Sequence, residues 1–517
     1  MKPASGNFGD LASEAIQLTP NKTALIGQSQ TITYRQLDQR MSQAGNLFSA
    51  YGVKKGDRVA LLFQNDVRYI EIFFGLQRIG AIPVPLNAKL SAEAIAYIIQ
   101  DSGAKILISH EALYEKAEQL HFTKLLEHVF IVGDHVGASS FFHYDSLVRE
   151  AADSLETVRV NEDDICFLPY TSGSTGKPKG CMLTHGGQWW NADMNRKALM
   201  IDREDRSLVS VPLYHKNAMI NAVKPGLIAG TSIVILPGFD AKAVLEAIHL
   251  HRVTYLTGVP AIYKLLVSYY KEIGKSQHYD LTSLKFFAVA SSDIPLDLID
   301  GLQSHFHVDI LESYGLTEGG PNVFVTPRWG VRRKGSAGLP LPGGEIRVVS
   351  TDGNEQSVPA GVIGELWVRN PGLAKGYWNL PGTTQERFTK DGWLKTGDLV
   401  KVDEDGYGQI IGRKDDMIIT GAENVYPKEI EDILYKHESI KDVCVVSAPH
   451  EIKGQVPVAF IIKASGAHLT EEEVQQFFLR NGPAYAYPRK VIFIETMPLS
   501  GTGKIDRTEL TRLAAGH

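Results

Sequence analysis

The chain has 517 residues, 44% of them hydrophobic and 22% charged, and this length exceeds one compact core, so we expect at least two domains. The net charge of -6 lacks the basic surplus of nucleic-acid-binding proteins, and three widely spaced cysteines exclude a disulfide framework or a CxxC metal site. The sequence has neither a leader pattern nor an apolar run long enough to span a membrane, so a cytoplasmic protein is predicted.

The chain up to about Gly133 alternates short apolar runs with helix-like segments. Residues 58–63 and 105–109 are predicted strands, and residues 91–99 between them form a predicted helix that Ser91 caps. Alternation of strands and helices is typical of the α/β fold class, which we therefore expect for this chain.

A loop rich in glycine, hydroxyl groups and lysine follows a predicted buried strand at residues 164–169. Glycines let backbone N–H groups approach an anion closely, while hydroxyls and ammonium groups add donors and positive charge. The loop supplies Thr171, Ser172, Gly173, Ser174, Thr175, Gly176, Lys177, Lys179 and Gly180. This combination predicts a loop that binds a ligand with several negative charges.

Two other interpretations of this loop are weaker. A flexible surface turn rarely follows a buried strand directly. A Walker A loop needs four residues between its glycines and a hydroxyl residue after Gly-Lys, whereas Gly173 lies three residues before Gly176 and Pro178 occupies the hydroxyl position. The loop is therefore not a Walker A loop.

The next predicted strand, residues 207–211, leads into Pro-Leu-Tyr-His, which ends at His215. A histidine at a strand end is often only a hydrogen-bonded residue near the core edge. Lys216 and Asn217 follow it. A Lys216 ammonium that faced an acid pocket would favour a substrate with a second polar or anionic group, and a solvated loop lysine is the alternative.

Three more predicted strands follow, at residues 231–236, 253–256 and 284–289, and a further strand at 308–311 leads to a motif at 312–318, Glu-Ser-Tyr-Gly-Leu-Thr-Glu. Magnesium prefers oxygen ligands, typically one or two carboxylates with phosphate and water. The motif offers the Glu318 carboxylate, the Thr317 hydroxyl for phosphate and the Tyr314 ring for a base. By itself this motif is an ordinary turn, but its occurrence together with the glycine-rich loop is not expected by chance.

The rest of the chain changes in character. Residues 345–349 and 364–368 predict a small antiparallel region, which is followed by a Gly-Asp pair at Asp398. Residues 410–421, with Arg413 and Asp415, mark a predicted domain boundary, for which a charged hairpin turn is the alternative.

A separate α+β module is predicted beyond this boundary. Pro427 opens one helix, and Thr470 with Glu473 forms a capping box for another. The module ends with glycines around a single lysine, Lys504.

These motifs, in this order, resemble those of the adenylate-forming superfamily of acyl-CoA and aryl-CoA ligases, adenylation domains and luciferases. The resemblance runs from about Thr23 to Arg507 and is nearest to 4-coumarate, 4-chlorobenzoate and medium-chain acyl-CoA ligases. It implies a large N-terminal domain of α/β subdomains plus a small β region, residues 1–414. It also implies a small, mobile α+β C-terminal domain, residues 415–517, that carries the catalytic lysine.

The resemblance implies an ATP-dependent carboxylate:CoA ligase that uses ATP, Mg²⁺ and coenzyme A. A carboxylic acid and ATP would form acyl-AMP and pyrophosphate, and the acyl group would then pass to the thiol with release of AMP. A free-standing adenylation enzyme that loads a carrier protein is the alternative. A degenerate nucleotide-binding protein is disfavoured because Lys504 and Glu318 are both present.

The family's roles are implied for matching positions in this chain. The catalytic residues would be Lys504, Thr317, Glu318 and His215, with Glu318 also as the metal ligand. The nucleotide and coenzyme A would be bound by Thr171, Ser172, Gly173, Ser174, Thr175, Gly176, Lys177, Ser292, Asp293, Tyr314, Asp398, Arg413, Gly421 and Ala422. Asp415 would be the hinge, and the acid pocket would include Trp190, Lys216, Asn217, Gly315 and Gly320.

The chain departs from the family pattern at two places. Ser292 and Asp293 stand where the family usually has glycine or alanine next to the adenine, and Ala422 stands where close relatives often have a second glycine. The aromatic residues among the candidate pocket positions favour an aryl or medium-length acid over acetate. The predicted partners are a small-molecule carboxylic acid and either coenzyme A or a carrier protein, with no nucleic acid and no membrane span.

Overall fold

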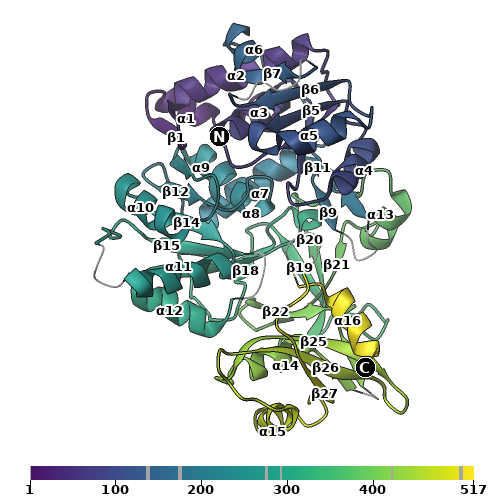
Figure 1. Cartoon of the computed structure of the whole chain (residues 1–517). Helices are drawn as coiled ribbons and strands as arrows, with labels where there is room; N and C mark the ends of the chain where they lie inside the picture. The colour runs from purple at the N-terminus through teal and green to yellow at the C-terminus, as the bar shows by residue number, and fades with distance from the viewer. Residues whose placement is uncertain are drawn as a thin grey trace. The chain divides into compact units, whose positions relative to one another are not determined.

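The structure is a computed structural model that describes residues 2–134, 140–172, 177–273, 278–290, 294–420, 423–499 and 505–516 (Figure 1). The chain divides into two compact units. The first comprises Met1–Ile346, Val368–Lys395 and Gly406–Gly408, and the second Arg347–Trp367, Thr396–Asp405 and Gln409–His517. The boundary predicted between residues 414 and 415 separates the N-terminal domain from a C-terminal domain that the resemblance expects to move. This boundary stays a prediction.

The first unit contains a parallel sheet with the strand order β4-β3-β5-β6-β7. Its strands are β3 (Arg58–Leu62), β4 (Ile82–Leu86), β5 (Ile106–His110), β6 (His128–Val132) and β7 (Phe142–His143). The helices between and beside these strands are α2 (Tyr34–Ala50), α3 (Val67–Arg78), α4 (Ala92–Ser102), α5 (Tyr114–His121) and α6 (Tyr144–Glu150). Ser91 caps α4 through the Ala94 N–H, so the strands and the helix predicted here are confirmed.

A second sheet of the first unit has the order β18-β17-β16-β15-β14-β12-β13-β1-β2. Its strands are β1 (Thr23–Ile26), β2 (Thr31–Thr33), β12 (Arg206–Val209), β13 (Ser232–Ile235), β14 (Tyr255–Gly258), β15 (Phe286–Ala290), β16 (Asp309–Tyr314), β17 (Phe324–Val325) and β18 (Leu339–Pro340). Neighbours from β1 to β16 pair in parallel. The strands β12 and β16 therefore end at the same edge of the sheet.

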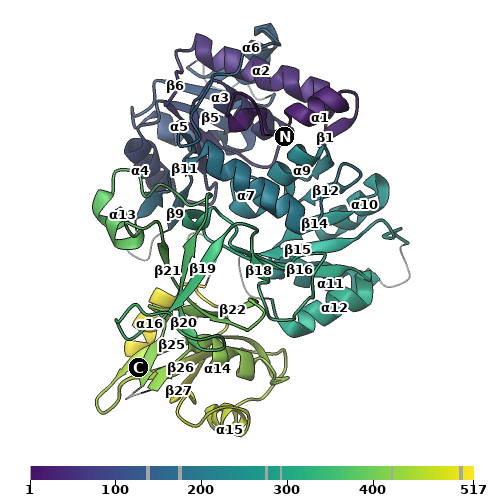
Figure 2. The same ribbon diagram turned by 180° about the vertical axis from the view of Figure 1, so that it is seen from behind.

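Both faces of this sheet are covered by helices (Figures 1 and 2). Leu208 packs in the core that contains α10 (Ala241–His251), α11 (Pro260–Ile273) and α12 (Leu296–Phe306), whereas its neighbour Val209 packs in the core that contains α7 (His185–Ala198) and α9 (Lys224–Ala229). Both faces of β12 are therefore covered, and the adjacent apolar residues Leu208 and Val209 made the strand predictable although Ser207 is buried with them.

Short strands lie between these two sheets in the sequence. Strand β8 (Ile165–Phe167) pairs with β11 (Leu183–Thr184), and β9 (Tyr170–Ser172) pairs with β10 (Pro178–Gly180) in antiparallel fashion. Ser172 stands opposite Pro178, so the two ends of the predicted phosphate loop are joined by a strand pair.

Four strands form a further sheet in the order β19-β20-β21-β22, and their residues are divided between the two units. They are β19 (Glu345–Val349), β20 (Ile363–Arg369), β21 (Leu394–Val402) and β22 (Gly408–Arg413). Further helices of the first unit are α1 (Ser13–Leu18), α8 (Lys216–Ala218), a π-helical turn over Met219–Val223, α13 (Pro381–Arg387) and short 3-10 helices at Phe8–Asp10, Glu111–Leu113 and Thr317–Gly319.

The second unit has a sheet in the order β24-β23-β26-β25, with β27 paired to β26. Its elements are β23 (Ile418–Thr420), β24 (Glu423–Val425), α14 (Pro427–Leu434), β25 (Ile440–His450), β26 (Gly454–Lys463), α15 (Glu471–Asn481), β27 (Lys490–Phe493) and α16 (Arg507–Ala515). Thr470 and Glu473 form the predicted capping box of α15, and α14 begins at Pro427. The α/β class and the α+β character of this last part are confirmed.

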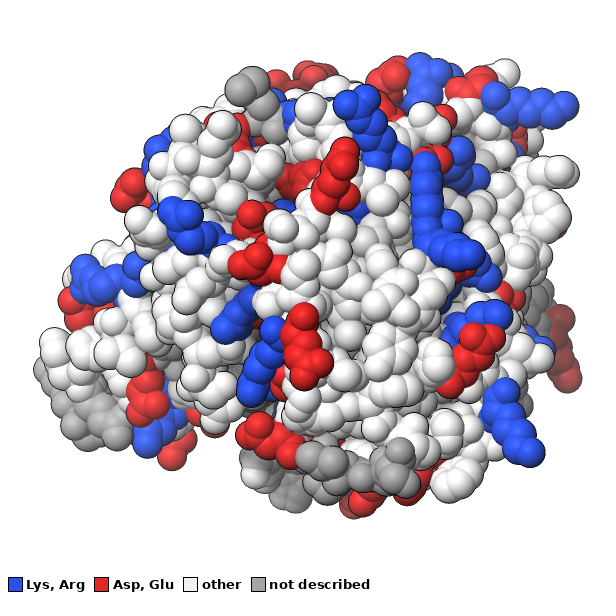
Figure 3. All heavy atoms as spheres, turned by 90° about the horizontal axis from the view of Figure 1, so that it is seen from above, with Lys and Arg blue, Asp and Glu red and all other residues white. Residues whose placement is uncertain are grey.

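Charged side chains of both signs are interspersed over the face of the molecule shown in Figure 3. This mixture agrees with the small net charge of -6. Among the described residues, none of the helices combines the length and apolar character needed to cross a lipid bilayer.

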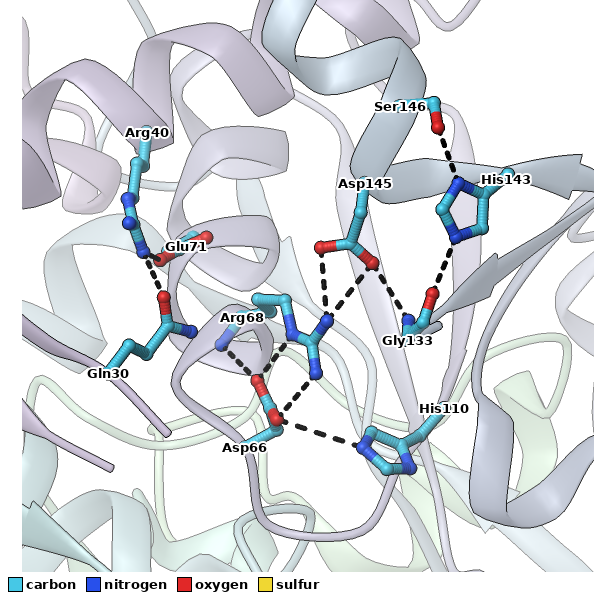
Figure 4. A network of polar contacts seen from close by, with 10 residues as sticks. All are labelled: Gln30, Arg40, Asp66, Arg68, Glu71, His110, Gly133, His143, Asp145 and Ser146. Atoms are coloured by element: carbon cyan, nitrogen blue, oxygen red, sulfur yellow. Dashed lines mark hydrogen bonds and ion pairs between the residues drawn. The ribbon is translucent and has the colours of Figure 1, made fainter. Parts of the chain in front are cut away.

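An ion-pair network connects α3, α6 and the sheet of β3 to β7 (Figure 4). Arg68 lies between Asp66, whose Oδ1 is 2.8 Å from Arg68 Nε, and Asp145, whose two oxygens are each 3.0 Å from Arg68 NH1. Burial raises the pKa of Asp66, but the hydrogen bond and charge of Arg68 outweigh it and hold that pKa below its usual value. Asp145 also accepts from the Gly133 N–H at 2.8 Å, so the network connects the first turn of α6 to the residue that follows β6.

His185, the first residue of α7, makes stability depend on pH. Its Nδ1 accepts from the Phe8 N–H at 2.9 Å, while its Nε2 is buried and has no hydrogen-bond partner within the described part of the chain. Burial lowers the pKa of His185 to about 4, below its usual value of 6.5. Because the folded state holds the neutral ring, this contribution is complete above pH 6.5 and declines as the pH falls toward 4.

We expect the wild type to lose about 2 kcal/mol of unfolding free energy through His185 between pH 7.5 and pH 5.0. His185→Asn keeps an acceptor near the Phe8 N–H but cannot titrate, so its unfolding free energy should fall less over the same interval. Urea unfolding of both proteins at the two pH values measures the difference. Equal losses in the two proteins would contradict the assignment.

Candidate functional site

The described ends of the predicted phosphate loop lie beside the Glu318 motif. Thr171 Oγ1, in β9, is 3.5 Å from Glu318 Oε1, although the two residues are 147 positions apart in the sequence. Lys177 Nζ is 5.5 Å from the centre of the Tyr97 ring, and Lys179 Nζ is 5.7 Å from that of Tyr377. The structure thus brings together the hydroxyl strand and the carboxylate that the sequence predicted for ATP and Mg²⁺.

Several predicted nucleotide-binding and catalytic positions lie outside the described residues. They are Gly173, Ser174, Thr175, Gly176, Ser292, Asp293, Gly421, Ala422 and Lys504, together with the side chain of Ser172. Their roles stay predictions from the resemblance.

Glu318 is oriented by Tyr377, a residue that the sequence analysis did not identify. Tyr377 Oη donates to Glu318 Oε1 at 2.9 Å, and the Glu318 carbonyl accepts from the Ala374 N–H at 2.9 Å. No Lys or Arg forms an ion pair with Glu318 in the part of the chain that the structure describes. A half-buried carboxylate beside a hydroxyl, without a protein counter-ion, fits the oxygen ligands that Mg²⁺ prefers.

The charge of Glu318 contributes to raised pKa values of two neighbouring groups, Tyr377 and Cys181. Burial raises the pKa of Tyr377, and the nearby carboxylate raises it further. Cys181 is fully buried with its Sγ 3.8 Å from Thr171 Oγ1, and burial together with the Glu318 charge raises the pKa of this thiol well above its usual value. Both groups therefore keep their protons at neutral pH.

Of the candidate acid-pocket residues, Trp190 lies in α7, whereas the other four lie in the segments that follow β12 and β16. Lys216 Nζ donates to the Gly315 carbonyl at 2.5 Å, so Lys216 is not a solvated loop lysine. His215 Nδ1 accepts from the Asn217 N–H at 3.3 Å and caps α8. The Asn217 side chain is buried between the Gly258 carbonyl and the Thr257 hydroxyl, which fixes it to the end of β14. The shared edge of the parallel strands explains why these loops meet.

Two glycines of this region have no room for a larger residue. A Cβ at Gly315 would lie 1.9 Å from the Pro321 carbonyl oxygen. Gly320 has φ +120°, and its Cβ would lie 2.9 Å from the Gly372 oxygen. Trp190 is adjacent to the same Gly372, whose Cβ would lie 3.2 Å from the indole ring. The described contacts therefore connect Trp190 with Gly320 through Gly372.

Within the second unit, Asp398 and Arg413 form an ion pair. Asp398 lies in β21 and Arg413 at the end of β22, and Arg413 Nε is 2.9 Å from Asp398 Oδ1. Asp415 is exposed in the turn after β22. The strands before and after this turn, β22 and β23, belong to different sheets, so the alternative of a hairpin is wrong.

Comparison with known proteins covers nearly the whole chain. A family model described as "AMP-binding enzyme" matches residues 12–378, and one described as "AMP-binding enzyme C-terminal domain" matches residues 429–504. A feruloyl-CoA synthase of an Amycolatopsis species is 34% identical over 497 residues, or 96% of both chains. An indoleacetate–CoA ligase of Aromatoleum aromaticum is 31% identical over 500 residues, again 96% of both.

Solved structures also match nearly the whole chain. A crystal structure of an anthranilate CoA ligase in complex with anthranoyl-AMP is 29% identical, with a TM-score of 0.89, and the match covers 98% of this chain and 97% of the other. ATP-bound MatB from Rhodopseudomonas palustris is 28% identical, also with a TM-score of 0.89, over 98% and 99% of the two chains.

Proposed function

The chain belongs to the AMP-binding enzyme family, and from that premise we propose that the loops around Thr171 and Glu318 carry out its adenylation chemistry. The chain is an AMP-forming acyl-CoA synthetase that uses ATP, Mg²⁺ and coenzyme A. It forms acyl-AMP and pyrophosphate from a carboxylic acid and ATP, and then an acyl-CoA thioester and AMP. The observation that supports the proposed site is the meeting of Thr171 with Glu318.

In the first half-reaction, an oxygen of the acid attacks the α-phosphorus and pyrophosphate leaves. No general acid or base is needed, so catalysis consists of positioning and of stabilising charge on phosphate. The loop from Thr171 to Gly180 would hold the outer phosphates with its N–H, hydroxyl and ammonium donors. Glu318 would hold the Mg²⁺ ion, which when bound would supply positive charge against the negative charge of the phosphates.

The other residues of the site have distinct proposed roles. Tyr377 orients the Glu318 carboxylate through its hydroxyl without neutralising its charge. Thr317 would contact phosphate and Tyr314 the base, while Asp398 with Arg413 would contact the ribose. Lys504 would bind the two anions that react.

In the second half-reaction, the thiol sulfur attacks the acyl carbonyl and AMP leaves. His215, at the end of the β12 loop, is proposed to lie between the acid pocket and the thiol. Rotation at Asp415, bringing Gly421 and Ala422 to the thiol, is proposed from the resemblance. Free coenzyme A is the proposed acceptor in preference to a carrier protein, because the named relatives are CoA ligases. A cytoplasmic location stays a prediction.

We further propose that the acid carries an aromatic group. The named relatives and neighbours include ligases of feruloyl, indoleacetate and anthranilate groups. Trp190, a candidate pocket position, packs against Gly372, whose carbonyl lies next to Gly320, so an aromatic side chain is present beside the Glu318 loop.

Pyrophosphate release tests both the activity and the acid. With ATP and Mg²⁺, aryl acids should give a kcat/KM at least about tenfold above that of aliphatic acids and dicarboxylic acids of similar size. A reaction without acid is the control. Release with aliphatic acids alone would overturn the aryl proposal, and no release with any acid would overturn the proposed site.

A further inference from the structure

A buried lysine that has been given no role so far is connected to the Glu318 loop through hydrogen bonds. Lys224, the first residue of α9, has an exposed fraction of 1%. Its Nζ donates to Gln188 Oε1 at 2.6 Å and lies 4.2 Å from the centre of the Phe167 ring. In the part of the chain that the structure describes, no carboxylate forms an ion pair with Lys224.

This burial is unfavourable for folding. An ammonium taken out of water without a counter-ion loses its hydration, and an amide oxygen and a ring face recover only part of that loss. Burial accordingly lowers the pKa of Lys224 to about 8. A methionine of similar length would avoid the loss, so the lysine requires an explanation other than stability.

Lys224 determines which way the Gln188 amide points. A lysine carries only donors, so the atom of Gln188 that faces it must be the oxygen. The NH₂ group of Gln188 must then point the other way, and its Nε2 donates to the Gly320 carbonyl at 3.0 Å. Gln188 is itself fully buried on α7. A chain of directed hydrogen bonds therefore runs from α9 through α7 to Gly320.

Gly320 belongs to the loop that carries Glu318. Three donors from other segments hold successive carbonyls of this loop: Ala374 N–H to Glu318 at 2.9 Å, Asn370 Nδ2 to Gly319 at 3.1 Å, and Gln188 Nε2 to Gly320 at 3.0 Å. Gly320 has φ +120°, a conformation that glycine adopts and other residues rarely do. Loss of the Gln188 bond would release the end of the loop two residues from Glu318.

We propose that Lys224 and Gln188 are positioning residues for acyl-AMP formation: the ammonium orients the Gln188 amide, which fixes Gly320 and thereby holds the Glu318 carboxylate beside Thr171. This inference rests on the proposed role of Glu318 as the magnesium ligand. In this proposal Lys224 and Gln188 act through the Gly320 carbonyl, and not by contact with the acid or the nucleotide.

The test compares the two half-reactions in Lys224→Met and Gln188→Leu. Each variant should form acyl-AMP about tenfold more slowly at limiting Mg²⁺ and need more Mg²⁺ for half of its maximal rate. Transfer from a supplied acyl-AMP to coenzyme A should remain within about twofold of the wild type. The double variant should be no slower than Gln188→Leu alone, because Lys224 acts through Gln188.

Melting temperature separates positioning from folding. Lys224→Met should not melt below the wild type, because it removes an unpaired buried charge. Lys197→Met, at an exposed lysine of α7 paired with Asp193, is the matched control and should leave both half-reactions unchanged. If Lys224→Met does not fold, Gln188→Leu alone decides.

Two results would overturn the inference. One is wild-type magnesium dependence in Gln188→Leu, and the other is equal loss of both half-reactions with a lower melting temperature. A failure of the proposed function would look different, because the wild type itself would then release no pyrophosphate with any acid.

Discussion

Lys504→Ala is expected to slow acyl-AMP formation by about a thousandfold while leaving transfer from a supplied acyl-AMP to coenzyme A nearly unchanged. The acid and the α-phosphate are both anions, and they must approach each other to react. An ammonium about 4 Å from a phosphate oxygen contributes a Coulomb energy of roughly 4 kcal/mol at an effective dielectric near 20, before desolvation is subtracted. No such pair of anions meets in the second half-reaction, so the effect should be confined to the first.

Two assays measure this division: pyrophosphate release with ATP and acid, and thioester formation from chemically prepared acyl-AMP. Lys441→Ala, at an exposed lysine of β25, is the matched control and should behave as the wild type in both. Equal loss of the two steps in Lys504→Ala would refute the assignment of Lys504 to adenylation.

Glu318→Gln should lower the rate of acyl-AMP formation by about a hundredfold at saturating acid and ATP, with a strongly raised magnesium requirement. The amide has the shape of the carboxylate and can still accept from Tyr377 Oη, so the loop should keep its position. Only the negative charge that attracts the cation is lost. Rates measured across a magnesium titration check this expectation.

Two further variants serve as controls for Glu318→Gln. Tyr377→Phe removes the hydrogen bond to Glu318 but leaves the charge, so its effect should be about tenfold smaller than that of Glu318→Gln. Glu127→Gln changes an exposed carboxylate paired with Lys105 and should have no effect. A Glu318→Gln enzyme with wild-type rates and magnesium dependence would exclude Glu318 as the metal ligand.

Local patterns explain which elements were predictable from the sequence. The helix expected at residues 91–99 is α4, because Ser91 caps its first turn and its apolar residues recur with helical spacing. The strand expected at residues 207–211 is β12, because its adjacent apolar residues Leu208 and Val209 pack in the cores on the two faces of the sheet. Caps and continuous apolar runs are encoded within a few residues, so no tertiary information is needed to recognise them.

The parts that were missed depend on packing between distant segments. Tyr377 contacts Glu318 across 59 positions, and Lys224 contacts Gln188 across 36, with no local motif at either partner. The bond between Lys216 and the Gly315 carbonyl is similar, although the resemblance named both residues as pocket positions. The hairpin alternative at residues 409–419 failed because sheet membership is decided by strands elsewhere in the chain.

The protonation state of the Cys181 thiol matters because the product of the first half-reaction reacts with thiolates. An acyl-adenylate is an activated mixed anhydride and will acylate a thiolate that it meets. The Cys181 sulfur is 3.8 Å from the Thr171 hydroxyl, yet burial and the Glu318 charge keep it protonated. Because thiols react as thiolates, an acyl-adenylate formed at the proposed site beside Thr171 would leave Cys181 unmodified and pass its acyl group to the incoming thiol.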